Sequence, residues 1–239
     1  MDLTSQGLTE LPVRPEELAG VTELHLDGNA LTALPDWIGD LTMLTTLSVS
    51  CNQLTELPAA LRRLTGLTEL QLGHNYLGRL PDWFGELTAL TDLHLFGNRL
   101  TALPESFGDL AALRNLHLFE NAFTEVPPVL RRLRGLTGLW LSDNRLTAVP
   151  EWIGDLTGLV RLALDRNRLT VLPERLGRLT ALTTLWLQDN ALTEVPGCVR
   201  DLTALTSLYL AGNPITEVPA WFPDLTHHDL SDTTARVHG

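Results

Sequence analysis

The stretch LVRLALDRNRLTVLPERLGRLTAL, from Leu159 to Leu182, contains every part of a pattern that fills most of the chain. Its asparagine recurs every 23 residues, at positions 29, 52, 75, 98, 121, 144, 167, 190 and 213. Its proline recurs with the same step, at positions 12, 35, 58, 81, 104, 127, 150, 173, 196 and 219. Nine asparagines and ten prolines in one frame define a repeat, so the sequence predicts a stack of similar structural units.

The leucines of the repeat predict one short strand in each unit. In Leu93-His94-Leu95 apolar and polar residues alternate, so both leucines lie on one face of the strand and His94 on the other. Such a short strand cannot bury its leucines alone, but stacked copies bury them together. We therefore expect a parallel sheet to which each repeat contributes one strand.

The proline and the asparagine of the repeat have predicted structural roles. The proline of PDWIGDL or PEWIGDL fits the first position of a short helical turn, and the acidic residues suit its positive N-terminal end. The asparagine at the strand exit is predicted to satisfy backbone groups that lose their sheet partners, and to bridge neighbouring repeats.

The motif LxxLxLxxNxLTxLPxxIGxLTx resembles the leucine-rich repeat family, in particular the 23-residue subtype of Ras-group-associated scaffold proteins and bacterial relatives. The resemblance implies an α/β solenoid of about nine to ten repeats. A parallel β-sheet would line the concave side of this horseshoe, and 3₁₀ or irregular helical turns the convex side. The solenoid is predicted over residues 1–226, with an incomplete first repeat, and residues 227–239 are predicted to be a degenerate C-terminal cap or a disordered tail.

Four pairs that begin with tryptophan are expected on the convex side. In each pair one member is predicted to continue the core, and the tryptophan either covers its neighbour's backbone or forms a second binding stripe; the pairs are Trp37-Ile38, Trp83-Phe84, Trp152-Ile153 and Trp221-Phe222.

Composition limits the classes of partner. The net charge of −12 argues against nucleic acid, whose binding depends on clustered positive charge. No apolar run reaches the ~18 residues needed to span a bilayer, and the first residues lack a secretory signal. Cys51 and Cys198 are about six repeats apart, too far for a disulfide. We expect a cytoplasmic monomer without cofactor, metal, membrane or nucleic-acid partner.

The side chains between the leucines vary from repeat to repeat, as expected where a shared frame carries a binding surface. His94 and His117 occupy equivalent positions in adjacent repeats, as do Phe96 and Phe119, and each pair is expected ~5 Å apart at Cβ. Aromatic residues ringed by charge have the composition of a binding hot spot. We therefore predict a non-catalytic protein- or peptide-binding module whose concave-face contacts are His94, Phe96, His117, Phe119, Trp140, Arg161, Asp165, Trp186 and Tyr209.

Other interpretations stay open at this point. An enzyme or peptide-modifying protein would use concave His and Asp residues. One such arrangement is a metal site formed by His94, His117 and Asp92, although a metal usually needs a fuller ligand set. Another is a Ser-His-Asp arrangement of Ser48, His25 and Asp27, which would lie on a flat strand without an oxyanion hole. The aromatic pairs could also only stabilise the sheet, and the chain could be a fragment or a consensus-like sequence without a natural ligand.

Overall fold

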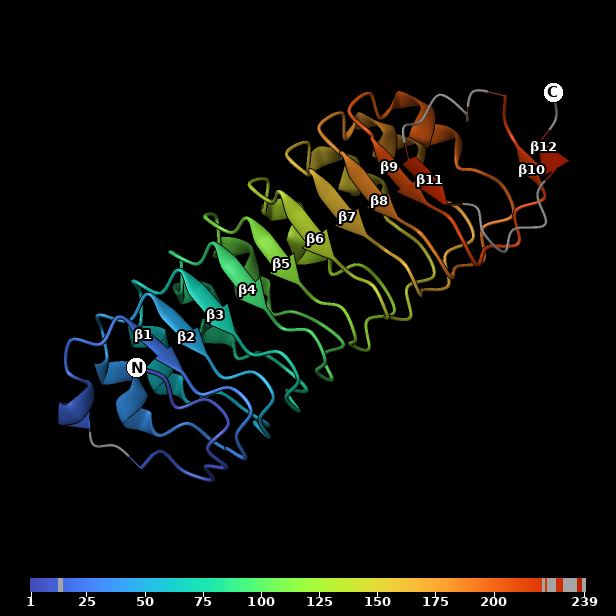
Figure 1. Cartoon of the computed structure of the whole chain (residues 1–239). Coiled ribbons are helices and arrows are strands. Elements are labelled where there is room, and N and C mark those ends of the chain that lie inside the picture. The colour runs from blue at the N-terminus through green and yellow to red at the C-terminus, as the bar shows by residue number, and fades with distance from the viewer. Residues whose placement is uncertain (13–14, 221, 223–226, 230–235, 238–239) are drawn as a thin grey trace. The chain divides into compact units, whose positions relative to one another are not determined.

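The computed structural model describes residues 1–12, 15–220, 222, 227–229 and 236–237. The chain divides into two compact units, Met1–Ala122 and Phe123–Gly239, which we call unit 1 and unit 2. In each unit short strands alternate with 3₁₀ helices (Figure 1). The alternation predicted from the repeat is confirmed.

The strands of unit 1 are parallel, and each pairs with the next strand in chain order. They are β1 (Glu23–His25), β2 (Thr46–Ser48), β3 (Glu69–Gln71), β4 (Asp92–His94) and β5 (Asn115–His117). The 3₁₀ helices of this unit are η1 (Pro15–Leu18), η2 (Asp36–Asp40), η3 (Ala59–Arg63), η4 (Asp82–Glu86) and η5 (Glu105–Asp109).

Unit 2 continues the same pattern. Its parallel sheet contains β6 (Gly138–Trp140), β7 (Arg161–Ala163), β8 (Thr184–Trp186), β9 (Ser207–Tyr209) and β11 (His227–Asp229). Its 3₁₀ helices are η6 (Pro128–Arg132), η7 (Glu151–Asp155), η8 (Glu174–Arg178) and η9 (Gly197–Asp201). A second, two-stranded sheet pairs β10 (Glu217–Val218) with β12 (Arg236–Val237).

The predicted C-terminal cap or tail, residues 227–239, is described only in part. Residues 227–229 form β11, which pairs with β9, whereas residues 230–235 and 238–239 lie outside the described residues. The boundary at residue 226 therefore stays a prediction.

The core consists mainly of the frame leucines. On β4, Leu93 and the following Leu95 have no exposed surface, and the same holds for Leu116 and Leu118 on the next repeat. The side chains between them point to the other side of the sheet and are half-buried, as the alternation predicts. Because a one-residue slip would exchange the two faces, the buried leucines fix the register of every strand.

In η2 to η9 the proline of the repeat lies one residue earlier than the sequence predicts. Pro35 is the residue before η2, in an extended conformation, and its carbonyl oxygen accepts a bond from the Ile38 N–H at 3.0 Å. Proline suits this place because the chain is extended there and no donor is needed from its nitrogen. Of the helices described here, η1 begins with Pro15 and η6 has Pro128 inside its first turn.

Glycine inside the 3₁₀ helices lets neighbouring repeats approach closely. A Cβ atom added to Gly85 in η4 would lie 2.0 Å from the Ser106 carbonyl oxygen of η5. The residue before the glycine is fully buried in the predicted pairs, at Ile38, Phe84 and Ile153, while the tryptophan before it is half-buried. Phe222 is also buried, and Trp221 lies outside the described residues.

The repeated asparagine makes the predicted bridge between repeats. The Asn98 Oδ1 atom accepts a bond from the Leu77 N–H of the preceding repeat at 3.0 Å. Its Nδ2 group donates to the Leu72 carbonyl at 2.9 Å and to the Leu95 carbonyl at 3.0 Å. One buried amide thus satisfies backbone groups where the chain leaves the strands of two neighbouring repeats, so the asparagine is a structural residue of the repeat.

Candidate binding surface

The outward side chains of β3, β4 and β5 form a regular array that we call the β3–β5 grid. Three rows cross the strands in register: Glu69, Asp92 and Asn115, then Gln71, His94 and His117, and, two residues after each strand, Gly73, Phe96 and Phe119. All eight side chains of the grid are half-buried, so each has both a packed and a solvent-facing part. The predicted contacts of unit 1 are therefore brought together on one face.

The imidazole rings of His94 and His117 stack, with centroids 4.2 Å apart and planes inclined by 28°. Burial lowers the pKa of His94, although the charges of Glu69 and Asp92 act in the other direction. Burial and the adjacent His94 together lower the pKa of His117 to about 4. Both rings are consequently neutral near pH 7, and the pair presents a polar but uncharged surface.

The phenyl rings of Phe96 and Phe119 stack beside the imidazoles. Their centroids are 4.5 Å apart and their planes are almost parallel, at 6°. The outer edge of the Phe96 ring lies over Gly73, where an added Cβ atom would come within 2.5 Å of the Phe96 Cζ atom. Gly73 therefore provides the space into which Phe96 leans, and it is a determinant of the ring positions.

The strand exits of unit 1 add a charged rim to the phenyl row. The His74 ring contacts Phe96 edge-on at 4.9 Å, and its Nδ1 atom lies 4.0 Å from the Glu120 carboxylate. Gly97 occupies the equivalent position in the repeat between them, with φ of +63°. A Cβ atom there would lie 2.3 Å from His74 Nδ1, so glycine makes this contact across a repeat possible.

The carboxylates of the grid accept hydrogen bonds from neutral amides. The Gln71 side chain donates to Glu69 at 2.5 Å, and the Asn115 side chain donates to Asp92 at 2.6 Å. These bonds orient the carboxylates, but a neutral donor leaves their negative charge uncompensated.

In unit 2 the predicted contacts are spread over four strands. Trp186 on β8 and Tyr209 on β9 lie parallel, with centroids 6.1 Å apart at 8°. Trp140 is separated from Trp186 by Ala163, which occupies the equivalent position on β7 and is 3% exposed.

The charged predicted contacts of unit 2 have different environments. Arg161 is exposed at the start of β7. Asp165 is half-buried and accepts a hydrogen bond from the Ser142 hydroxyl at 2.5 Å. Arg161 thus presents its charge to solvent, whereas Asp165 is held in place by its bond from Ser142.

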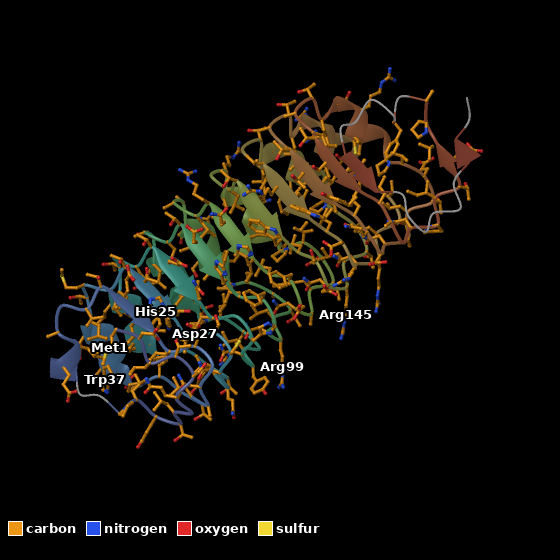
Figure 2. All side chains as sticks on the ribbon, in the orientation of Figure 1. Met1, His25, Asp27, Trp37, Arg99 and Arg145 are labelled. Atoms are coloured by element: carbon orange, nitrogen blue, oxygen red, sulfur yellow. The ribbon has the colours of Figure 1, made fainter. Side chains whose placement is uncertain are left out.

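The Ser-His-Asp arrangement considered from the sequence does not have catalytic geometry. His25 and Asp27 project from β1 and the loop after it (Figure 2). The Ser48 hydroxyl donates directly to Asp27 at 2.6 Å, while His25 lies 3.7 Å from Glu23. Ser48 is only 1% exposed, so its hydroxyl is a structural donor and not an accessible nucleophile.

Over the described residues, no group of three or more His, Cys, Asp or Glu side chains has the geometry to hold a metal ion. In the same part of the chain, no helix has both the length and the apolar character needed to cross a bilayer.

Sequence reasoning missed several residues that shape the surface. Gly73, His74 and Gly97 position the phenyl row, yet none was predicted as a contact. The available signal was a glycine in the third row next to a phenylalanine in the following repeat. Sequence reasoning also missed a cation–π contact, in which the Arg99 guanidinium lies 4.6 Å from the centre of the Tyr76 ring. Arg99 extends away from the strands (Figure 2).

The repeated frame and its buried leucines define a family. The chain matches the leucine rich repeat family over residues 19–77, 42–100, 80–123 and 157–215, which together are more than half of the sequence. It therefore belongs to the leucine-rich repeat family, as the resemblance of its motif predicts. No curated protein shows significant sequence similarity to it.

Solved structures support the same conclusion. A leucine-rich repeat protein of Leptospira interrogans has a TM-score of 0.85 and 27% identity, with 99% of this chain and 72% of that chain covered. The ectodomain of the Arabidopsis thaliana receptor kinase GASSHO1/SCHENGEN3, solved in complex with CASPARIAN STRIP INTEGRITY FACTOR 2, has a TM-score of 0.81 and 30% identity. The plant peptide hormone receptor RGFR1, solved in complex with RGF2, has a TM-score of 0.76 and 30% identity.

The two receptors are much longer than this protein. The match to GASSHO1/SCHENGEN3 covers 96% of this chain but 29% of that one, and the match to RGFR1 covers 90% and 36%. The leucine-rich repeat fold is thus confirmed over almost the whole chain, while the likeness extends to only about a third of each solved receptor chain.

Proposed function

We propose that this chain is a non-catalytic module that binds a protein or an extended peptide through the outward sides of its strands. The contacts in unit 1 are His94, Phe96, His117 and Phe119; those in unit 2 are Trp140, Arg161, Asp165, Trp186 and Tyr209. The observation that carries the proposal is the stacking of four rings on the solvent side of β4 and β5, where they stay half-exposed. Large, rigid and partly exposed rings with polar neighbours are typical of binding hot spots.

The family supports this proposal in general terms. GASSHO1/SCHENGEN3 was solved in complex with CASPARIAN STRIP INTEGRITY FACTOR 2, and the plant peptide hormone receptor RGFR1 in complex with RGF2. An open sheet face suits docking better than chemistry, because it excludes water poorly. The burial of Ser48 points in the same direction, since it removes one candidate nucleophile from solvent.

The proposal includes the setting expected from the sequence. We propose that the protein acts as a cytoplasmic monomer, without cofactor or metal, and that nucleic acid and membranes are not its partners. The net charge of −12 supports the exclusion of nucleic acid.

The test compares two tryptophans of unit 2 that lie on different faces. Short random peptides are selected against the whole chain, and their dissociation constants are measured for the wild type, Trp140→Ala and Trp152→Ala. Trp140 is on the strand face, whereas Trp152 is on η7. Trp140→Ala is expected to weaken binding by ~2 kcal/mol, about 30-fold in the dissociation constant, as is typical for loss of a hot-spot tryptophan. Trp152→Ala is expected to leave the dissociation constant unchanged.

Both variants keep the buried frame, so circular dichroism should show the same folded signal for all three proteins. Peptides that bind Trp140→Ala as tightly as the wild type would remove Trp140 from the site. If, in addition, none of the selected peptides responds to alanine at His94, Phe119 or Trp186, the strand-face proposal is wrong.

A further inference from the structure

The outward face of unit 1 carries negative charge and has neither lysine nor arginine at its strand positions. Its outward positions on β1 to β5 and after these strands hold four carboxylates: Glu23, Asp27, Glu69 and Asp92. The remaining positions hold neutral polar residues, histidines, Gly73 and the two phenylalanines, and none holds Lys or Arg. A face of this kind is complementary to a cationic partner.

Elsewhere in the same unit, arginine neutralises carboxylates. Arg63 lies 2.8 Å from Asp40, and Arg62 lies 3.6 Å from Glu86, both on the helical side. The carboxylates of the β3–β5 grid have neutral amide donors instead, from Gln71 and Asn115. Because amides leave the charge in place, Glu69 and Asp92 are free to interact with a positive charge from outside.

The rings beside these carboxylates are suited to the same charge. The His94 and His117 imidazoles stay neutral near pH 7, so they do not repel a cation. The groups that face His94 are Glu69 and Gln71 on β3, Asp92 on its own strand, and Asn115 and His117 on β5, and none of them carries a positive charge at that pH. The rings of Phe96 and Phe119, one row beyond the histidines, offer an apolar surface for the aliphatic part of an arginine side chain whose guanidinium reaches the carboxylates.

We propose that the β3–β5 grid recognises a basic segment of a partner protein, with an arginine side chain lying on the His94–His117 and Phe96–Phe119 rings and its guanidinium directed to Asp92 and Glu69. Arginine fits better than lysine, because its planar group stacks on rings and binds a carboxylate through two parallel hydrogen bonds. This inference rests on the proposed function and adds the chemical class of the partner.

The test uses the peptides selected against the whole chain, together with their citrulline analogues, in which each arginine is replaced by its neutral counterpart. Binding is measured by fluorescence anisotropy near neutral pH for the wild type and for the pair Glu69→Gln with Asp92→Asn. The matched control is Glu56→Gln with Asp82→Asn, which removes the same amount of charge from exposed positions of unit 1 outside the strand face.

We expect the selected peptides to be enriched in arginine. The grid pair should raise the dissociation constant at least about tenfold, and citrulline should do the same, as expected for loss of a charge-assisted bidentate contact. The control pair should change it less than about twofold, because it alters only distant, screened charge.

Three outcomes would overturn the inference while leaving the proposed function standing. The first is selection of peptides without basic residues that lose binding on Phe119→Ala. The second is equal weakening by the grid pair and the control pair, which would indicate unspecific attraction to an acidic protein. The third is unchanged binding of the citrulline analogue. Failure to select any peptide sensitive to the strand face would instead overturn the proposed function itself.

Discussion

Replacing Asn98 by alanine tests how much stability one bridging amide provides. Asn98 is 8% exposed, and its side chain joins two repeats of unit 1. Removing it deprives the Leu77 N–H of its acceptor, which lies at 3.0 Å. It also removes one donor from each of three carbonyl groups, those of Leu72, Leu95 and Phe96.

The four lost bonds do not have equal consequences. The Phe96 carbonyl still accepts a bond from the His74 N–H at 2.8 Å. The Leu72 carbonyl still accepts a bond from Asn75 at 3.2 Å, and the Leu95 carbonyl still accepts one from Asn121 at 3.0 Å. The Leu77 N–H loses this acceptor in a buried place, and an unsatisfied buried donor costs ~1 to 3 kcal/mol. With a smaller contribution from the weakened carbonyl bonds, Asn98→Ala should lower the free energy of unfolding by about 2 to 3 kcal/mol.

The matched control is Asn115→Ala, which removes a half-buried amide from the strand face of the same unit. Its side chain donates to Asp92, and solvent can replace that bond, so the expected cost is below about 1 kcal/mol. Urea unfolding followed by circular dichroism measures both variants, with unchanged slopes as the condition for comparing them. Equal costs for Asn98→Ala and Asn115→Ala would refute the assignment of the repeated asparagine to the frame.

Three further predictions follow from the ring array and the cysteines. Gly73→Ala should displace the Phe96 ring, because the new Cβ atom would lie 2.5 Å from the Phe96 Cζ atom. The displacement should appear as a shift of the Phe96 ring resonances in NMR spectra. Unchanged resonances would contradict the position of the Phe96 ring over Gly73. His117 has a pKa of about 4 in the folded protein, against an ordinary value of 6.5. Between pH 6.5 and pH 4 the unfolded chain therefore binds more protons than the folded one. The free energy of unfolding should accordingly fall as the pH is lowered from 6.5 to 4. His117→Gln should reduce that fall in urea titrations at several pH values, and an identical pH profile would refute the assignment. Cys51 is exposed, whereas Cys198 is buried and its burial raises the pKa of its thiol to about 12. A thiol-reactive dye should therefore modify only Cys51 in the native protein and both cysteines after unfolding. Rapid labelling of Cys198 in the native state would contradict its burial.

The fold could be predicted from the sequence because its determinants recur. Leu93 and Leu95 are buried, Asn98 bridges two repeats, and Phe84 enters the core, as their positions in the frame indicate. A repeated residue type predicts structure in this way when the same physical requirement, such as burial, applies at the equivalent position of every repeat. The sequence placed Pro35 one residue too late, at the first position of η2. An extended proline before a helix and a proline at its first position have the same sequence pattern, so the sequence could not distinguish them.

The candidate surface could be predicted only in part. The register places His94 beside His117 and Phe96 near Phe119, so the sequence indicates which residues share a face. It does not indicate that Phe96 leans over Gly73, because side-chain direction depends on the size of the neighbour in the preceding repeat. Nor could it show that Ser48 bonds to Asp27 instead of His25, since all three share one face and only distances decide between them.

The ring array also limits how far folding and binding can be separated in this protein. The frame residues are fully buried, so substitutions there should act on stability, and exposed residues such as Arg161 should act on binding alone. Phe96 and Phe119 are half-buried and stack on each other at 4.5 Å, so removing either ring costs packing as well as a contact. Gly73→Ala changes the position of Phe96 without removing any ring atom, and Asp92→Asn changes charge without changing shape. For this reason these two substitutions, and not alanine at the rings, can separate the contribution of the surface to binding from its contribution to the stability of the sheet.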